Sequence, residues 1–408
     1  MAIVLEGLAS TDHESQDAAE RRLRELAGEG LSSGEAAELI AAAPREWPER
    51  KYDFVDTGQD LIDAAATVAA PAHVEELMRG CGGLTPEARS SALMLLAAVD
   101  SPLAAEGILG LVAAHARGDA PLARLATPPF RRQLNQGSVL FPRLLEHVEL
   151  PRLGADIVDI ALGFAEAGAI GSAELAPAQG TLTAAAARRR RAIEAFDPIP
   201  TGPAAWRDEA YFDARLQAGL FADLLGHVPG EDVVAELRSL AALSDPGPAG
   251  FAVCSLVRLG LEPDRGAVDA VGADPDMRNL VYDRLSQLGR RDLFPERFTT
   301  QIAFAESELV RWLTFPGEIG EVPEEQFFEA IVSDDELDCY VFRFASENAG
   351  EGWFAAVVGP YERRLAPTTE ILGQAFSTFR PFEELDAEGH VEDVLGTIEE
   401  WAPRREDS

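Results

Sequence analysis

Apolar residues recur at helical spacing through most of the chain. From about residue 15 to about residue 300, Ala- and Leu-rich stretches alternate with short breaks marked by Pro, Gly or Asp, which is the pattern of consecutive amphipathic helices. Proline often stands at the first position of a stretch, where a helix tolerates its missing N–H. We expect helices over 17–27, 33–43, 86–99, 102–116, 153–167, 183–196, 204–225 and 232–243.

The pattern changes after residue 300. Aromatic and β-branched residues fill three runs of strand length, 326–332, 338–345 and 352–359, as is typical of strands. The loop 346–351 between the last two predicts an antiparallel hairpin, and the amphipathic segment 391–401 predicts a closing helix. The sequence therefore predicts a mainly α fold, in which a helical-repeat domain over residues 1–300 is followed by a small α+β module over residues 301–408.

Two segments near the end of the helical region repeat each other. Asp245-Pro246 precedes Asp274-Pro275 by 29 residues, and Leu259-Gly260 precedes Leu288-Gly289 by the same interval. In each copy the Asp can cap a helix, the Pro fits its first turn and the Gly ends it. Residues 85–115 form a looser version with two helices in tandem.

This pattern resembles HEAT-like and armadillo-like helical-repeat proteins, whose second helix often opens with Asp-Pro followed by Arg. Arg278 occupies that Arg position, whereas the first copy has Gly250 nearby and no Arg. The interval is shorter than the roughly 40 to 47 residues of that class, so an irregular all-α domain is the alternative. The resemblance implies stacked helices with a concave surface for partners, and it implies no activity.

The chain is strongly acidic. It has 70 Asp and Glu against 35 Lys and Arg, a net charge of −35, and residues 301–408 carry −18 of it. Such a surface repels phosphate backbones and anionic lipids. We therefore expect neither nucleic acid nor a membrane as partner, and we expect a protein partner that is basic. Adaptation to high salt is the alternative source of the acidity.

The N-terminus and the cysteines indicate the compartment. The first residues, MAIVLEGLASTDHE, lack a basic region, and the longest apolar run, 92–99, has eight residues where a membrane span needs about 20. Cys81, Cys254 and Cys339 are odd in number and far apart, which does not fit a disulfide framework. We expect a soluble, cytoplasmic protein.

Local motifs for catalysis or cofactor binding are missing. Lys51 is the only lysine and does not belong to a P-loop, the glycines of 28–34 miss the dinucleotide spacing, and the six histidines show no zinc spacing. The run 333–338 lacks the Gly and the final Glu of an EF-hand loop, so it predicts a solvated turn. We expect no catalytic residue, no metal and no cofactor.

Two clusters are candidates for contacts with a partner. The basic run Arg188 to Arg191 either complements the end of its helix or forms a docking patch. Most aromatic residues after 310 must form a core, but an exposed Trp or Tyr within an acidic rim is typical of a protein-binding anchor. The partner-binding candidates are Trp353, Tyr361, Asp334, Asp335 and Glu336.

These observations favour a non-enzymatic interaction protein, a scaffold or adaptor that uses a helical array and an acidic C-terminal module. Two alternatives stay open. One is an inhibitor or immunity-type protein that neutralises a basic enzyme. The other is an enzyme or small-ligand receptor with a pocket between the array and the module, formed by residues dispersed along the sequence.

Overall fold

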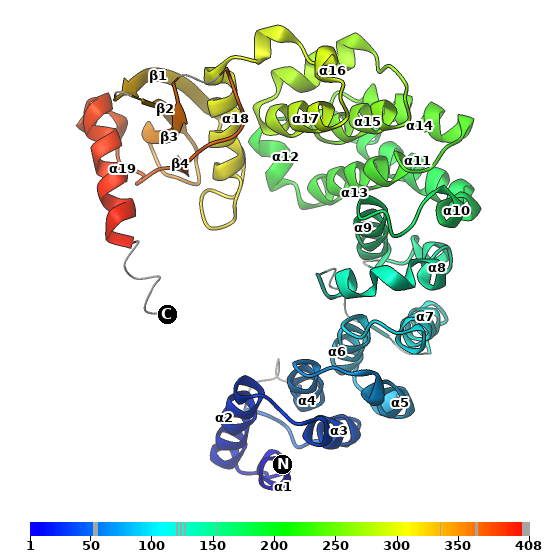
Figure 1. The fold of residues 1–408 in the computed structure, drawn as a ribbon. Coiled ribbons are helices and arrows are strands. Elements are labelled where there is room, and N and C mark those ends of the chain that lie inside the picture. The colour runs from blue at the N-terminus through cyan, green and yellow to red at the C-terminus, as the bar shows by residue number, and fades with distance from the viewer. Residues whose placement is uncertain are drawn as a thin grey trace. The chain divides into compact units, whose positions relative to one another are not determined.

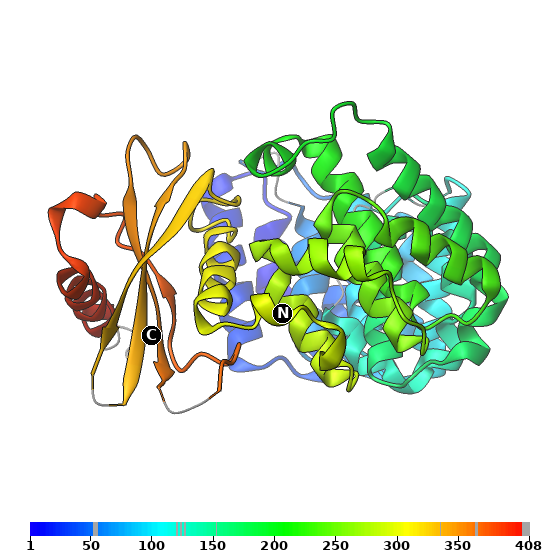
Figure 2. The same ribbon diagram turned by 90° about the horizontal axis from the view of Figure 1, so that it is seen from above.

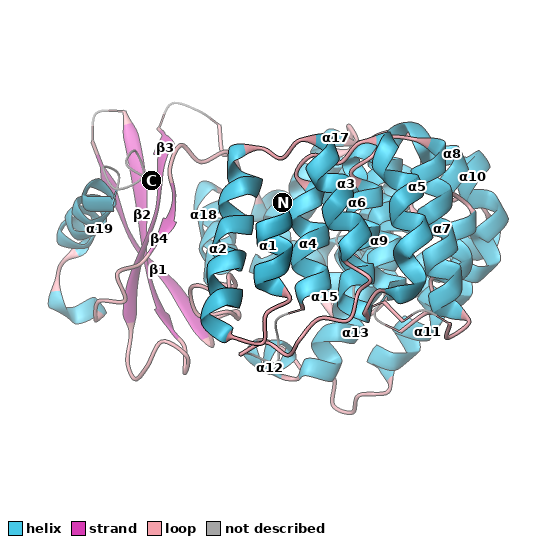
Figure 3. Ribbon diagram, turned by 90° about the horizontal axis from the view of Figure 1, so that it is seen from below, coloured by secondary structure: helices cyan, strands magenta, loops and turns pink. Residues whose placement is uncertain are grey.

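The computed structural model describes residues 1–51, 56–119, 121–122, 125, 128–151, 153–334, 336–363 and 366–401. Helices make up most of these residues, and the strands are confined to a small sheet near the C-terminus (Figure 1, Figure 3). The predicted mainly α fold with a small α+β module is confirmed. The chain divides into two compact units, Met1–Ala185 and Ala186–Ser408. The boundary expected at residue 300 therefore falls inside the second unit.

The first unit is a series of packed helices. Successive helices lie against near neighbours, such as α1 on α2, α3 on α4 and α6 on α7. The unit contains α1 (Ala2–Leu8), α2 (His13–Glu29), α3 (Ser33–Ala42), α4 (Thr57–Ala66), α5 (Pro71–Gly80), α6 (Pro86–Ala97), α7 (Pro102–Ala116), α8 (Gly137–Leu140), α9 (Leu153–Glu166) and α10 (Ser172–Leu175); α11 (Gln179–Glu194) crosses the boundary.

Local sequence explains where these helices begin. Helix α7 covers the predicted residues 102–116, and the Ser101 hydroxyl accepts a hydrogen bond from the Ala104 N–H (3.2 Å). Pro102 stands at its first position, as the pattern required. Ser32 and Glu35 form a capping box at α3. No described helix combines the length and apolarity that a membrane crossing requires.

The second unit begins with a helical layer. Its helices are α12 (Pro203–Arg207), α13 (Glu209–Leu225), α14 (Glu231–Ala241), α15 (Pro246–Arg258), α16 (Arg265–Ala273), α17 (Pro275–Gln287) and α18 (Gln301–Leu313). Both Asp-Pro copies behave as predicted: Asp245 caps α15 and Asp274 caps α17. Gly260 and Gly289 follow these helices with φ of 77° and 70°, a backbone conformation that glycine adopts at little cost.

The α+β module completes the second unit. Its antiparallel sheet has the order β1 (Glu325–Ser333), β2 (Leu337–Ala345), β3 (Phe354–Glu362) and β4 (Gln374–Phe376). The predicted hairpin pairs β2 with β3, and the predicted C-terminal helix is α19 (Ala387–Trp401). Helices α18 and α19 cover opposite faces of the sheet (Figure 2), so each face has an apolar core.

The structure differs from the prediction at two elements. The helix expected over 204–225 is two helices, because Asp208 ends α12 and its side chain accepts from the Tyr211 N–H (3.0 Å) to start α13. Strand β4 was not predicted. It has three residues, and its pairing with β3 rather than its own pattern defines it.

Candidate functional site

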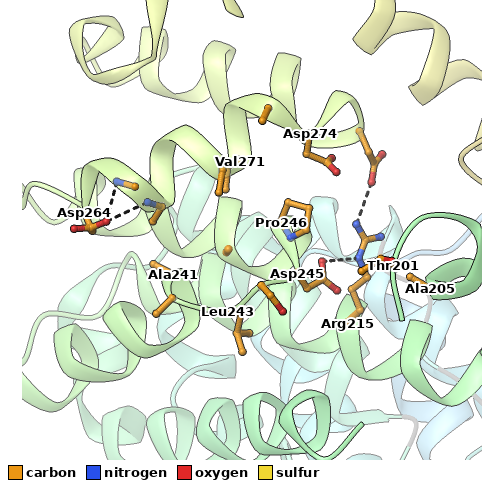
Figure 4. A pocket seen from close by; sticks show the side chains of 18 of the residues that line it. Thr201, Ala205, Arg215, Ala241, Leu243, Asp245, Pro246, Asp264, Val271 and Asp274 are labelled. Carbon is orange, nitrogen blue, oxygen red and sulfur yellow. Dashed lines mark hydrogen bonds and ion pairs between the residues drawn. The ribbon is translucent and has the colours of Figure 1, made fainter. Parts of the chain in front are cut away.

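A pocket of about 840 Å³ opens in the helical layer of the second unit. Helices α12 to α17 supply most of its wall, and Val322 adds to it from the segment before β1. Arg207 at the end of α12 holds this segment, since its guanidinium donates to both carboxylate oxygens of Glu321 (2.7 and 2.6 Å). Apolar residues such as Ala241, Leu243 and Val271 line one part of the pocket (Figure 4).

A buried ion pair organises the polar end of the pocket. Asp245 is 5% exposed, and its carboxylate accepts from Arg215 Nε (3.0 Å), the Gly247 N–H (2.8 Å) and the Tyr211 hydroxyl (2.6 Å). Arg215 also donates through Nη2 to Asp276 (3.1 Å) (Figure 4). Burial alone would lower the pKa of Arg215, but Asp245 and Asp276 outweigh it and raise that pKa. Arg215 is therefore a fixed cation with two carboxylate partners.

Asp274 lies at the same end without a cation of its own. Its Oδ1 accepts the Met277 N–H at the start of α17 (3.1 Å), and no described Arg, Lys or His forms an ion pair with it. Burial, together with the negative charge of Asp276, raises the pKa of Asp274 from 3.8 to about 6. The ionised carboxylate is thus less favourable here than in water, although the nearby Arg215 guanidinium partly offsets this effect.

The pocket as a whole favours cations. Asp245, Glu262, Asp264, Asp274 and Asp276 line it against two guanidinium groups, those of Arg215 and Arg238. Trp206 adds an aromatic wall, with the Arg215 guanidinium carbon 5.5 Å from its ring centroid. Carboxylates beside an aromatic ring and apolar side chains suit an ammonium or guanidinium group with an apolar stem.

The described residues offer little for metal binding or nucleophilic chemistry. No three His, Cys, Asp or Glu side chains among them are placed to hold a metal ion. The thiols of Cys81 and Cys254 are buried, and burial raises the pKa of both, which disfavours the reactive thiolate. The expected lack of a cofactor stays a prediction.

The acidic turn predicted as a contact joins β1 to β2. Asp334 and Glu336 are exposed, and Asp334 Oδ1 accepts the N–H groups of Glu336 (2.9 Å) and Leu337 (2.8 Å). These hydrogen bonds lower the pKa of Asp334, so it is ionised at neutral pH. Asp335 lies outside the described residues. The described part of this segment is the solvated turn that the sequence predicted.

The two aromatic candidates have different environments. Trp353 is half-buried, with its ring 5.5 Å from that of Phe327 and 4.8 Å from the Arg343 guanidinium carbon. Tyr361 is 2% exposed and packs in the core against Tyr340 (5.6 Å). The structure therefore removes Tyr361 from the candidate contact surface, because its position on β3 turns the ring toward α18.

The basic run on α11 makes contacts within the second unit. Arg190 pairs with Glu236 of α14 (2.7 Å) and Glu194 (2.8 Å). The guanidinium carbon of Arg189 lies 4.8 Å from the ring centroid of Phe221 on α13. These contacts favour the structural interpretation of the run.

Sequence reasoning assigned Asp245 and Asp274 only to helix caps and did not single out Arg215 or Trp206. One available signal was the 29-residue repeat of Asp-Pro. If the two helices that it begins lie side by side, their capping carboxylates come close together, as those of α15 and α17 do at the pocket.

Comparison with known proteins gives one family. The model of the uncharacterised protein family UPF0181 matches residues 4–52, which include most of α1 and the whole of α2 and α3. The UPF0181 protein YE1782 of Yersinia enterocolitica is 41% identical over 64 residues, which are 15% of this chain and 75% of that protein. An engineered protein solved by crystallography matches 77% of this chain and 84% of its own at 16% identity, with a TM-score of 0.25. Through its N-terminal stretch, the chain belongs to the uncharacterised protein family UPF0181.

Proposed function

We propose that the protein is a non-enzymatic interaction protein, a scaffold or adaptor, that holds a cationic side chain of a basic partner in the pocket of its second unit. The observation that carries the proposal is Asp274, a largely buried carboxylate with a raised pKa and no cation of its own. A guanidinium or ammonium group placed beside it would let it ionise at lower cost. The excess of carboxylates on the pocket wall supports the same partner charge.

The proposed architecture is a HEAT-like helical array with an acidic module at its end. Capped and glycine-ended helices α15 and α17 support it, as does Arg278 at the position that the resemblance assigns. In this architecture the pocket provides specificity, while the −18 charge of residues 301–408 speeds encounter with a basic partner and is screened by salt. An inhibitor of a basic enzyme would use the same surfaces.

A small-ligand receptor is the second candidate. The pocket volume falls within the roughly 300 to 1,000 Å³ of small-molecule sites, and its wall combines apolar residues with a few polar groups. A receptor would bind a free cationic molecule such as an arginine amide as tightly as an arginine-containing peptide. An interaction protein gains affinity from each further peptide contact.

We expect the full chain to bind an (Arg-Gly)₄ peptide, and Asp274→Asn to weaken that binding about tenfold at pH 7.5, since one unpaired carboxylate in a partly buried site is worth about 1.4 kcal/mol toward a cation. Isothermal titration calorimetry at 50 and 200 mM NaCl measures the affinity. Asn keeps the capping oxygen of α17, so the helix is preserved.

Glu296→Gln is the matched control. It removes the same charge from an exposed residue outside the pocket wall, and it should change the affinity by less than twofold. Equal losses of affinity in the two variants would mean that only the net charge of the protein matters, which would contradict a site at Asp274. Peptide affinity no higher than that of arginine amide would favour the receptor.

A further inference from the structure

Strand β1 is an open edge of the sheet. The strand order places this nine-residue strand at one end, where eight of its residues pair with β2 and no second strand of the described residues adjoins it. The other edge, β4, has three residues. An edge strand presents backbone N–H and C=O groups that lack a partner strand, and an added strand can pair with them.

The register shows which backbone groups face outward. Asp334 donates its N–H to the Leu337 carbonyl (3.0 Å), and β1 pairs with β2 in register through Ser333, Val332, Ile331 and Ala330. Because hydrogen-bonded and non-hydrogen-bonded pairs alternate along an antiparallel ladder, Val332 and Ala330 direct their N–H and C=O toward β2. Ile331 and Ser333 direct theirs away from the sheet.

Large apolar side chains lie exposed along the same edge. Phe327 is 46% exposed, Phe328 37% and Ile331 45%. Phe328 and Ile331 pair with Phe342 and Tyr340, so they belong to the α18 face, on which α18 leaves them partly uncovered. An added strand that alternates apolar and charged residues would cover them with its apolar face.

The three remaining contact candidates, Trp353, Asp334 and Glu336, flank this edge. Phe327 and the Trp353 ring that it contacts lie toward one end of β1. The exposed Asp334 and Glu336 lie at the turn beyond the other end. At about 3.3 Å per residue, the strand between them spans roughly 20 Å. A single extended segment of six or seven residues could therefore contact both groups.

The acidic residues along β1 favour a basic segment over a second copy of this chain. Glu325 and Glu329 lie on β1, and Asp334 and Glu336 follow it; Arg343 on β2 pairs with Glu329 (2.7 Å). A second copy would bring the same acidic edge against itself, which like charges disfavour. A bulge between Phe328 and Ala330 further limits self-pairing, since it interrupts a continuous ladder.

We propose that β1 accepts an extended cationic segment of a protein partner as an added strand, paired with residues 330–333. This proposal rests on the proposed function, because it gives the acidic interaction protein a second contact and a mode of binding. Main-chain hydrogen bonds to Ile331 and Ser333 provide affinity. Basic side chains of the segment meet the acidic turn, and its apolar side chains cover Ile331 and Phe328.

The test uses two peptides of equal charge with the full chain. Acetyl-Arg-Val-Arg-Val-Arg-Val-Arg-amide can form a strand, and the same peptide with proline in place of valine cannot. We expect the valine peptide to bind at least tenfold more tightly and to protect the amides of residues 330–333 from hydrogen exchange. Ile331→Pro removes an outward N–H and should lower the affinity for the valine peptide at least tenfold. The affinity for the proline peptide should change less than twofold. Ile331→Thr keeps the N–H and should lower the affinity for the valine peptide only about threefold.

The outcomes separate this proposal from the proposed function. If both peptides bind equally and only Asp274→Asn lowers their affinity, β1 is not the contact and the pocket proposal is supported. If Asp274→Asn has no effect while Ile331→Pro abolishes the preference for the valine peptide, the β1 proposal is supported and the pocket proposal is contradicted. Far-UV circular dichroism and exchange in residues 337–345 must match the parent in Ile331→Pro. A concentration-dependent dimer in light scattering that Ile331→Pro dissolves would overturn the proposal in favour of a second copy.

Discussion

Arg278→Ala should destabilise the second unit by about 3 to 5 kcal/mol, the cost typical of removing one partner from a buried charged network. Arg278 is 4% exposed. Its guanidinium donates to the carbonyls of Gly272 (2.9 Å) and Ala273 (3.1 Å) at the end of α16. On α18 it donates to the Ala303 carbonyl (2.8 Å) and to Glu306 (2.7 Å). Alanine would leave these acceptors without their donor.

The effect is measured as the shift in urea midpoint, with hydrogen exchange of peptides from 265–313 to locate it. Arg297→Ala is the matched control: Arg297 pairs with Asp269, but both side chains are well exposed, at 60% and 40%. Exposed pairs contribute about 1 kcal/mol or less, so the control should shift the midpoint little. Equal shifts would mean that the carbonyl contacts of Arg278 contribute no stability.

Sequence pattern predicted the elements whose signals are local. The Asp-Pro starts and Gly ends of α15 and α17 follow from capping chemistry that acts within one helix turn. Leucine spacing alone does not define the buried face of α17. Leu285 is fully buried, but Leu280 and Leu288 are half-buried, and the other buried apolar residues of this helix are Met277, Val281 and Tyr282.

The pocket could not be predicted because its residues meet only after the helices stack. Trp206, Arg215, Asp245 and Asp274 come from four positions over some 70 residues, and Val322 comes from another 50 residues on. Each has an ordinary local role, such as a helix cap or a helix-face residue. Their shared function depends on the packing of α13 on α15 and of α15 on α17, which spacing in sequence does not specify.

Asp274→Asn should stabilise the protein above pH 6. In the unfolded chain Asp274 ionises near its ordinary pKa of 3.8, whereas burial and Asp276 raise the pKa in the folded chain to about 6. As pH rises from 3.8 to 6, the unfolded state releases this proton first, so folding stability falls. Above pH 6 the cost is complete, about 3 kcal/mol for two pKa units.

Asparagine is neutral at every pH and keeps the capping oxygen, so the variant should gain up to about 3 kcal/mol at pH 7.5 and about half of that at pH 5. Urea midpoints at the two pH values measure the gain. Asp264→Asn removes the same charge from an exposed cap at the pocket rim and should change stability little. A gain independent of pH would mean that the ionised carboxylate is not its source.

The sign of this change distinguishes a binding residue from a structural one. Neutralising a carboxylate that stabilises the fold would lower the free energy of unfolding. Asp274→Asn is instead expected to raise the free energy of unfolding and to lower the affinity for the (Arg-Gly)₄ peptide tenfold. Opposite effects on folding and binding are typical of a site whose unfavourable buried charge is compensated by its ligand.

The peptide should also bind more weakly to the parent protein at pH 5 than at pH 7.5, because below pH 6 a cation must first displace the proton on Asp274. The Asn variant has no such proton, so its peptide affinity should change much less between these two pH values.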